Sequence, residues 1–239
     1  MKKIIAFCLG AVLILGFAVY GFSANKATNN NKTQATTAAT PKKDAAQSEA
    51  KASNTSVDLK TVPGNKILVA YFSRTGDNYA VGNISKGNTH IVADAIAKDL
   101  GAKTFEIKTV KQYPANYRET TQVAQQERSS NVRPEMATKV DNMQDYDVIF
   151  LGYPIWWSDM PMVIYNFMES YDFQGKTIIP FCTSAGNVLT GKESNIPKYA
   201  KGATVLQGLG IEGKRAQENP AGIEPEIKAW LGKLGFSVQ

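Results

Sequence analysis

Hydroxyl, amide and glycine residues are concentrated in one polar loop that follows an apolar run. The loop starts with Ser73-Arg-Thr-Gly-Asp-Asn78 and, after an insertion, ends with Lys86-Gly-Asn-Thr89. Residues of this kind can surround a phosphate, because backbone N–H groups point outward at a helix N-terminus and the helix dipole favours an anion. The same residues would also suit a plain polar turn in which Thr89 caps the helix. The loop is therefore a candidate phosphate site with a purely structural alternative.

Two further loops carry residues suited to a flat ligand. In the first, Gly152-Tyr-Pro-Ile-Trp-Trp157, two tryptophans follow an apolar run. Flat aromatic rings at the edge of a sheet can stack on a flat ligand, although they can also pack on a neighbouring helix. The second loop is Thr183-Ser-Ala-Gly-Asn187, whose small residues let the backbone approach a ligand edge closely. Neither loop decides the function alone, so their position in the fold matters.

The three loops each follow a predicted β-strand. Short β-rich runs alternate with amphipathic segments, which indicates an α/β fold. The nearly continuous apolar character of the first run is typical of a parallel strand that is buried on both faces. Five strands are predicted, at residues 66–72, 104–108, 147–152, 176–182 and 204–209. In such sheets ligands bind beyond the carboxyl ends of the strands, which is where all three loops lie.

Helical spacing of apolar residues predicts the elements that connect these strands. Helices are expected at residues 89–100, 117–128, 161–170 and 223–234. Pro180, inside the fourth predicted strand, indicates a bulge or an end of pairing. The segment Gly208-Leu-Gly-Ile-Glu-Gly213 matches a dinucleotide-binding fingerprint. We expect only a turn there, because residues 214–220 make a poor helix start and no later strand completes the unit.

Charge and cysteine content exclude several classes of protein. Of the net charge of +6, most belongs to the first 60 residues, whereas a nucleic-acid binder would concentrate basic residues in its folded domain. His90 is the only histidine, and Cys8 and Cys182 are the only cysteines. The sequence therefore predicts no metal site and no disulfide in the domain. His90 is expected on a helix surface near the phosphate, and Cys182 as a small buried apolar residue.

The N-terminal part of the chain differs in composition from the rest. Lys2 and Lys3 precede an uncharged, mostly apolar run up to Phe22, so residues 1–24 are expected to be a signal peptide or a membrane anchor. Residues 25–60 contain almost no large apolar side chains and are expected to form a disordered tether. Residues 61–239 would be the folded domain. Either outcome for the first segment predicts an extracytoplasmic location, secreted or anchored to the outer face of the membrane.

With these motifs, the chain resembles the flavodoxin family, and in particular its exported bacterial members. The resemblance runs from about Lys66 to Gln239 and rests on four motifs in the expected order: Ser73-Arg-Thr-Gly76, Gly87-Asn-Thr89, Tyr153-Pro-Ile-Trp-Trp157 and Thr183-Ser-Ala-Gly186. It implies a flavodoxin-like three-layer sandwich, with a five-stranded parallel sheet of order 2-1-3-4-5, that binds FMN non-covalently.

The resemblance also implies which residues form the cofactor site. The phosphate would be held by the first loop, through Ser73, Arg74, Thr75, Asn88 and Thr89, with Asn78 close by. The isoalloxazine would be flanked by the other two loops, through Pro154, Ile155, Trp156, Trp157, Ser184, Ala185, Gly186 and Asn187. Many members have a glycine in the loop after the third strand, where this chain has Trp157-Ser-Asp159.

Three functions remain open at the level of sequence. The first is an FMN-binding electron carrier that exchanges electrons with a redox protein or a quinone-like acceptor and needs no catalytic residue of its own. The second is a flavin-dependent NAD(P)H reductase of quinones, azo or nitro compounds. The third is a ligand-binding module without redox activity. The fold is common to all three, so the site must distinguish them.

Overall fold

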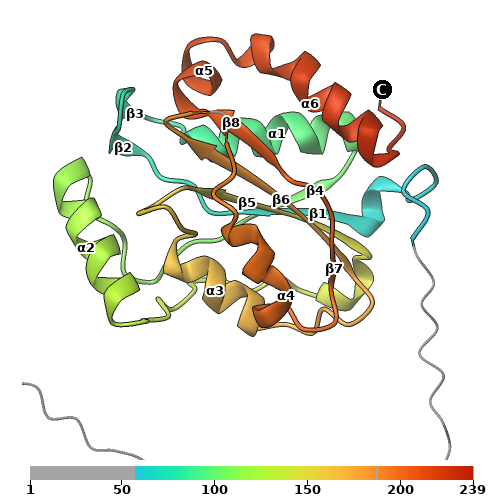
Figure 1. Ribbon diagram of the computed structural model, residues 1–239, viewed down its shortest axis with the longest axis horizontal. Coiled ribbons are helices and arrows are strands. Elements are labelled where there is room, and N and C mark those ends of the chain that lie inside the picture. Colours follow the sequence, from blue (N-terminus) through green and yellow to red (C-terminus); the bar gives the residue numbers. More distant parts are fainter. Residues whose placement is uncertain (1–56, 187, 239) are drawn as a thin grey trace, which may run out of the picture. The chain divides into compact units, whose positions relative to one another are not determined.

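The computed structural model describes residues 57–186 and 188–238, which contain a central parallel sheet (Figure 1). Its main path runs in the order β4-β1-β5-β6-β7, and β8 also pairs with β6. The strands are β1 (Ile67–Tyr71), β4 (Lys103–Glu106), β5 (Val148–Pro154), β6 (Thr177–Ser184), β7 (Thr204–Val205) and β8 (Leu209–Glu212). With β4 as the second predicted strand, this confirms the parallel sheet of order 2-1-3-4-5.

Helices cover both faces of the sheet and complete a three-layer sandwich (Figure 1). One face carries α1 (Asn88–Leu100), α5 (Gly213–Glu218) and α6 (Pro220–Leu234). The other carries α3 (Met162–Glu169) and α4 (Ile196–Tyr199), with α2 (Tyr117–Ser129) beside α3. Three short 3-10 helices are η1 (Gly64–Lys66), η2 (Met143–Asp145) and η3 (Lys192–Asn195). A small hairpin of β2 (Gly76–Asn78) and β3 (Gly82–Ile84) interrupts the loop between β1 and α1.

The first strand shows why the sheet is buried on both sides. Leu68 and Ala70 belong to the apolar cluster under α3, while Ile67 and Val69 belong to the cluster under α1 and α6. Because successive side chains of a strand point to opposite faces, an uninterrupted apolar run supplies both clusters at once. The buried strand places its carboxyl end, and the polar loop after it, at the edge of the sheet.

Two short strands, β7 and β8, share the position beside β6, and Pro180 of β6 lies between their pairing regions. β7 pairs with β6 at Thr177 and Ile178, and pairing resumes with β8 at Phe181. The N–H of Leu206 donates to the Ile178 carbonyl at 3.0 Å. Alternate residues of a strand present their backbone groups to the same neighbouring strand. Pro180, two residues after Ile178, therefore faces the same edge as Ile178 does, but it has no N–H to donate. The strand predicted at residues 204–209 is therefore two short strands.

The prediction of a turn in the glycine-rich segment before α5 is wrong. Leu209–Glu212 form β8, and Gly213 begins α5. Gly210 and Gly213 both lie where a side chain would clash: a Cβ on Gly210 would lie 2.7 Å from the Val188 carbonyl carbon, and one on Gly213 would lie 2.3 Å from Asn88 Nδ2. The segment is a strand followed by a helix, at an edge of the sheet that also carries the predicted site.

The start of the domain lies earlier than predicted. Val57 and Leu59 pack against the apolar cluster under α1 and α6, four and two residues before the expected boundary. The predicted signal or anchor at residues 1–24 and most of the predicted tether at residues 25–60 lie outside the described residues. Within residues 57–186 and 188–238, no helix is long and apolar enough to cross a membrane.

Candidate functional site

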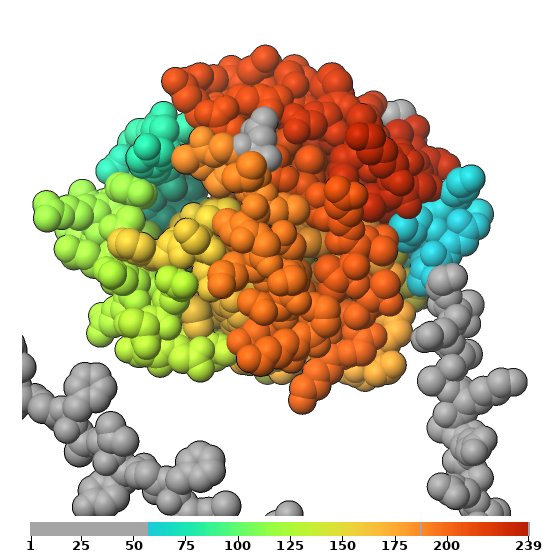
Figure 2. Space-filling view, viewed as in Figure 1, coloured from blue at the N-terminus to red at the C-terminus, as the bar shows by residue number. Residues whose placement is uncertain are grey.

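A cleft opens where the carboxyl ends of β1, β5 and β6 meet the hairpin and α2. Its volume is about 510 Å³, within the range of about 300–1,000 Å³ that is usual for small-molecule sites. Figure 2 shows the hollow between the hairpin, α2 and the loops that follow β5 and β6. The cleft therefore lies where open parallel sheets bind their ligands.

At one end of the cleft, the loop after β1 is fastened to the first turn of α1. The Ser73 hydroxyl accepts the backbone N–H of His90 at 3.1 Å. The residue that precedes the helix is Gly87, which has no side chain with which to cap it. A Cβ at Gly87 would lie 2.2 Å from Ser73 Oγ, so only glycine allows this approach. The N–H groups of Asn88 and Thr89 also belong to this first turn, where a helix offers no acceptor of its own.

Arg74 is bonded to backbone carbonyl groups. Its guanidinium donates to the carbonyl oxygens of Asp77, Pro114 and Ala115. Burial lowers the pKa of Arg74 from its ordinary value, and Asp77 acts in the opposite direction. The resemblance implies a phosphate contact for this residue; in the structure, its donors connect the loop after β1 to the segment before α2. Arg74 still lines the cleft, so its charge contributes to the field inside it.

Asn88 has a buried side-chain oxygen that lacks a hydrogen-bond partner. Asn88 Oδ1 is shielded from solvent and accepts no bond from any described residue. The neighbouring Thr89 hydroxyl is bonded to the Thr183 hydroxyl at 2.8 Å, and this bond joins α1 to the end of β6. Asn88 lines the cleft together with Thr183 and Gly213. A buried polar group without a partner is costly, so a donor on a bound ligand would satisfy it.

Trp156 is held edge-on by two aromatic rings of the core. Its ring centroid lies 4.9 Å from that of Tyr113 and 5.3 Å from that of Phe72, at interplanar angles of 86° and 89°. Behind it, the Tyr113 hydroxyl donates to Glu127 at 2.8 Å. Burial raises the pKa of Glu127 and outweighs the lowering by this bond and by Lys111. Burial and Glu127 also raise the pKa of Tyr113, so the tyrosine stays neutral.

Trp157 stands in a tight turn with an unusual backbone. The N–H of Trp156 donates to the Asp159 carbonyl at 2.9 Å, and the N–H of Asp159 donates back at 3.0 Å. The two residues between them, Trp157 and Ser158, have φ values of 51° and 59°, a region that favours glycine. The Trp157 Nε1–H donates to the Thr121 carbonyl of α2 at 3.0 Å. The indole is thus fixed at the mouth of the cleft and is 46% exposed.

The side chain of Asp159 stabilises this turn through contacts of both carboxylate oxygens. Its Oδ1 accepts the backbone N–H of Met160 at 2.8 Å and the Tyr165 hydroxyl at 2.7 Å. Its Oδ2 lies 3.5 Å from Arg128 Nε on α2. Burial and the bond to Asp159 raise the pKa of Tyr165. Trp157 and Asp159 therefore connect the loop after β5 to α2 by two separate polar contacts.

The structure brings most of the predicted site residues to the cleft. Those that line it are Arg74, Asn78, Asn88, Pro154, Ile155, Trp156, Trp157, Ser184 and Ala185. Four predicted residues are not among the lining residues: Ser73, Thr75, Thr89 and Gly186. Ser73 and Thr89 instead fasten α1, as described above. Asn187 lies outside the described residues.

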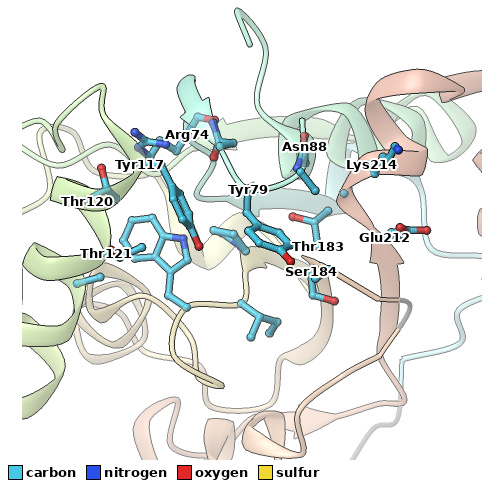
Figure 3. Close-up of a pocket in the computed structure, with 18 of the residues that line it drawn as sticks. Arg74, Tyr79, Asn88, Tyr117, Thr120, Thr121, Thr183, Ser184, Glu212 and Lys214 are labelled. Carbon is cyan, nitrogen blue, oxygen red and sulfur yellow. The ribbon is translucent and has the colours of Figure 1, made fainter. Parts of the chain in front are cut away.

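Sequence reasoning missed residues from three other segments (Figure 3). They are Tyr79, Ala80, Tyr117, Thr120, Thr121, Ala124, Glu212, Gly213 and Lys214. Thr183, the first residue of the predicted loop after β6, also lines the cleft. The insertion and the glycine-rich segment were visible signals for two of these groups. Nothing in the sequence of α2 indicates a site, because its polar face resembles any solvated helix.

The sheet order and the cleft at the carboxyl ends of its central strands define a flavodoxin-like α/β protein. Residues 66–233 match the family model described as flavodoxin. The chain belongs to the flavodoxin family.

The solved structures that are similar to this chain include two candidate flavoproteins. A candidate flavoprotein from Bacteroides uniformis is 31% identical, with a TM-score of 0.55; the match covers 69% of this chain and 99% of that one. A candidate flavoprotein from Bacteroides eggerthii is 29% identical, with a TM-score of 0.54; the match covers 70% of this chain and 96% of that one. Among curated proteins, none matches the chain.

Proposed function

We propose that the protein binds FMN non-covalently in this cleft and acts as an electron carrier outside the cytoplasm. One observation carries the proposal. The cleft has the first turn of α1, with Asn88, at one end and the indole of Trp157 at the other. A helix N-terminus suits a phosphate and an exposed indole suits a flat ring, so the two ends match the two ends of FMN.

The residues of the cleft fit this cofactor chemically. Asn88 Oδ1 needs a hydrogen-bond donor, which a ribityl hydroxyl supplies. Gly213 lets the Asn88 side chain pack against the start of α5, because a Cβ there would lie 2.3 Å from Asn88 Nδ2. Lys214 lines the cleft and adds positive charge near the phosphate end. Ser184 and Ala185 form the wall opposite α2, where small side chains allow a ring edge to approach the backbone.

The protein's part in the chemistry is binding, orientation and exclusion of water. FMN, when bound, supplies the electron-transfer chemistry itself. Trp157, fixed to Thr121, covers the mouth of the cleft. Trp156, held by Tyr113 and Phe72, keeps the inner wall apolar. No general acid or nucleophile is required for this role.

Titration of the flavin-free protein with FMN tests the proposal. We expect a stoichiometric loss of flavin fluorescence, because indoles that stack on the ring quench it. The affinity for riboflavin should be weaker by at least about tenfold, since charge-assisted bonds to the phosphate are lost. Trp157→Ala should weaken FMN binding by about tenfold, and Trp157→Phe by less. Val132→Ala, which removes an exposed apolar side chain outside the cleft, is the control. No uptake of FMN by the wild-type protein would refute the assignment.

A reductase is the second candidate, and the exposed aromatic rings at the mouth of the cleft favour it. Mixing the FMN-loaded protein with NADH or NADPH separates the two functions. An unchanged flavin absorbance supports a carrier that requires a protein partner. Rapid bleaching, followed by turnover with a quinone, supports the reductase.

The proposed location rests on Lys2, Lys3 and the apolar run that follows them. Protease treatment of intact cells, with and without permeabilisation of the outer layers, tests it. Digestion of the domain while a cytoplasmic marker survives supports an external domain. Protection until the cytoplasmic membrane is broken contradicts it.

A further inference from the structure

The mouth of the cleft carries more aromatic surface than one bound ring needs. Six large apolar side chains are exposed in the described residues, and three of them line this cleft: Tyr79, Tyr117 and Trp157. Tyr79 is 62% exposed and Tyr117 is 38% exposed. Exposed aromatic side chains that gather in one place mark binding surfaces more often than scattered ones do.

The two tyrosines come from different elements and face each other. Tyr79 lies at the tip of the hairpin, just after β2, and Tyr117 is the first residue of α2. Their ring centroids are 6.1 Å apart, with an angle of 42° between the planes. Both rings point into the cleft from the same wall (Figure 3). At this distance the two rings contact each other, as aromatic pairs do.

Hydrogen bonds of Asp77 and Arg74 join the hairpin that carries Tyr79 to the segment that begins α2. The N–H of Asp77 donates to the Ala115 carbonyl at 2.9 Å, and Asp77 Oδ2 accepts the N–H of Tyr117 at 3.4 Å. Arg74 donates to the carbonyls of Asp77 and Ala115 from the other side. The hairpin is therefore hydrogen-bonded to the start of α2, where Tyr117 lies.

The charges around the pair indicate the kind of molecule it accepts. Of the charged side chains that line the cleft, Glu212 and Lys214 lie at the wall opposite Tyr117 and α2 (Figure 3). Arg74 lies close to the pair, but its donors are bonded to carbonyls. The other residues that line the cleft are uncharged. An uncharged planar ring loses no ion pair here and gains contact with two aromatic faces.

We propose that Tyr79 and Tyr117 form a second binding subsite, which holds a planar, uncharged aromatic molecule at the mouth of the cleft beside the cofactor. The proposal rests on the proposed FMN site, because the tyrosine pair is surplus only if Trp157 serves the flavin ring. The subsite would also give a function to the hairpin inserted between β1 and α1, which phosphate binding by the flanking loop does not need.

Equilibrium dialysis of the full-length, FMN-saturated protein against 1,4-naphthoquinone tests the subsite. We expect saturable binding of the quinone to the wild-type protein. Tyr79→Ala and Tyr117→Ala should each weaken it by about fivefold, since one aromatic contact is lost. Tyr79→Phe and Tyr117→Phe should retain most of the affinity because the ring remains. Val132→Ala serves as the matched control for the loss of an exposed apolar side chain elsewhere.

Titration of the same variants with FMN alone separates this proposal from the cofactor assignment. If both alanine variants bind FMN within about twofold of the wild type while quinone binding falls, the subsite is supported. If they lose FMN affinity as much as quinone affinity, the tyrosines belong to the cofactor site and the subsite is refuted. Absence of saturable quinone binding to the FMN-loaded wild type also refutes it. Failure of the wild type to take up FMN refutes the proposed function instead.

Discussion

The Ser73 hydroxyl caps helix α1 from outside the helix, by accepting the backbone N–H of His90 at 3.1 Å. His90 is the third residue of α1, and its N–H is one of those that a serine or threonine directly before the helix would satisfy. Here Gly87 takes that position, and the hydroxyl arrives from the loop after β1. One side chain thereby joins the loop after β1 to the first turn of α1, at the end of the cleft proposed for the phosphate.

Ser73→Ala should lower the free energy of unfolding by about 1 kcal/mol, because it leaves a helix N-terminus without its cap. Urea denaturation followed by far-UV circular dichroism measures the change. Ser85→Ala, at an exposed serine of the same connection between β1 and α1, should change stability far less. Equal stability of Ser73→Ala and the wild type would show that the hydroxyl contributes no cap.

Gly87→Ala should destabilise the protein more than Ser73→Ala does. The new Cβ would lie 2.2 Å from Ser73 Oγ and 2.6 Å from the Arg74 carbonyl oxygen, and overpacking of this kind costs about 1–3 kcal/mol. Adding Ser73→Ala to Gly87→Ala should not restore stability, since the clash with the carbonyl persists. Urea denaturation of the single and double variants checks both statements. A double variant as stable as Ser73→Ala would contradict the geometry.

Ser158→Gly should raise the free energy of unfolding by about 0.5 kcal/mol. Ser158 has a φ of 59°, which is unfavourable for any residue with a Cβ, and the gain is reduced by the greater freedom of glycine in the unfolded chain. Ser130→Gly is the matched control. Ser130 has a φ of −94°, so glycine there should only destabilise. The opposite order of the two variants in thermal or urea unfolding would contradict this prediction.

The carboxyl of Glu127 should make stability fall as the pH rises. Burial raises the pKa of Glu127 in the folded protein, so the folded state holds this proton more tightly than the unfolded chain does. Its stabilising effect is complete below the unfolded pKa and is lost as the pH rises through the raised folded value. Glu127→Gln should remove this component and keep an acceptor for the Tyr113 hydroxyl. Urea unfolding at several points between about pH 4 and pH 8 compares the two proteins.

Cys182 should resist thiol reagents while the protein is folded. Burial raises the pKa of its thiol to about 12, and only the thiolate is nucleophilic. In a Cys8→Ser background, reaction with a colorimetric disulfide reagent near neutral pH should be slow, and denaturant should accelerate it. Fast labelling of the folded protein would contradict the burial of Cys182.

The sequence predicts the strands of the sheet better than it predicts the residues that line the cleft. The run Lys66-Ile-Leu-Val-Ala-Tyr-Phe72 predicts a buried parallel strand, because only a strand covered on both faces is apolar at every position. The tryptophans and the small residues after Thr183 are informative because of their type. Tyr117 and Thr121 give no such signal, since they reach the cleft through the placement of α2.

Contacts between distant segments determine the surroundings of other residues that the sequence singles out. Arg74 has the charge expected of a phosphate ligand, but carbonyl oxygens far along the chain take up its donors. The segment Gly208–Gly213 has the glycine spacing of a dinucleotide-binding fingerprint and is predicted to be a turn, yet it forms a strand and a helix start, with Gly213 packed against Asn88. Both outcomes depend on contacts between distant segments, which local sequence patterns do not contain.

The interruption at Pro180 also affects how the molecule behaves among copies of itself. An unpaired sheet edge is a template on which another chain can add a strand and begin to aggregate. Here the outer position beyond β6 is split between β7, with two residues, and β8, with four. Edges this short offer few consecutive backbone groups to an incoming strand. At this edge of the sheet, a single proline thus keeps the stretches of unpaired backbone too short to pair readily with another copy.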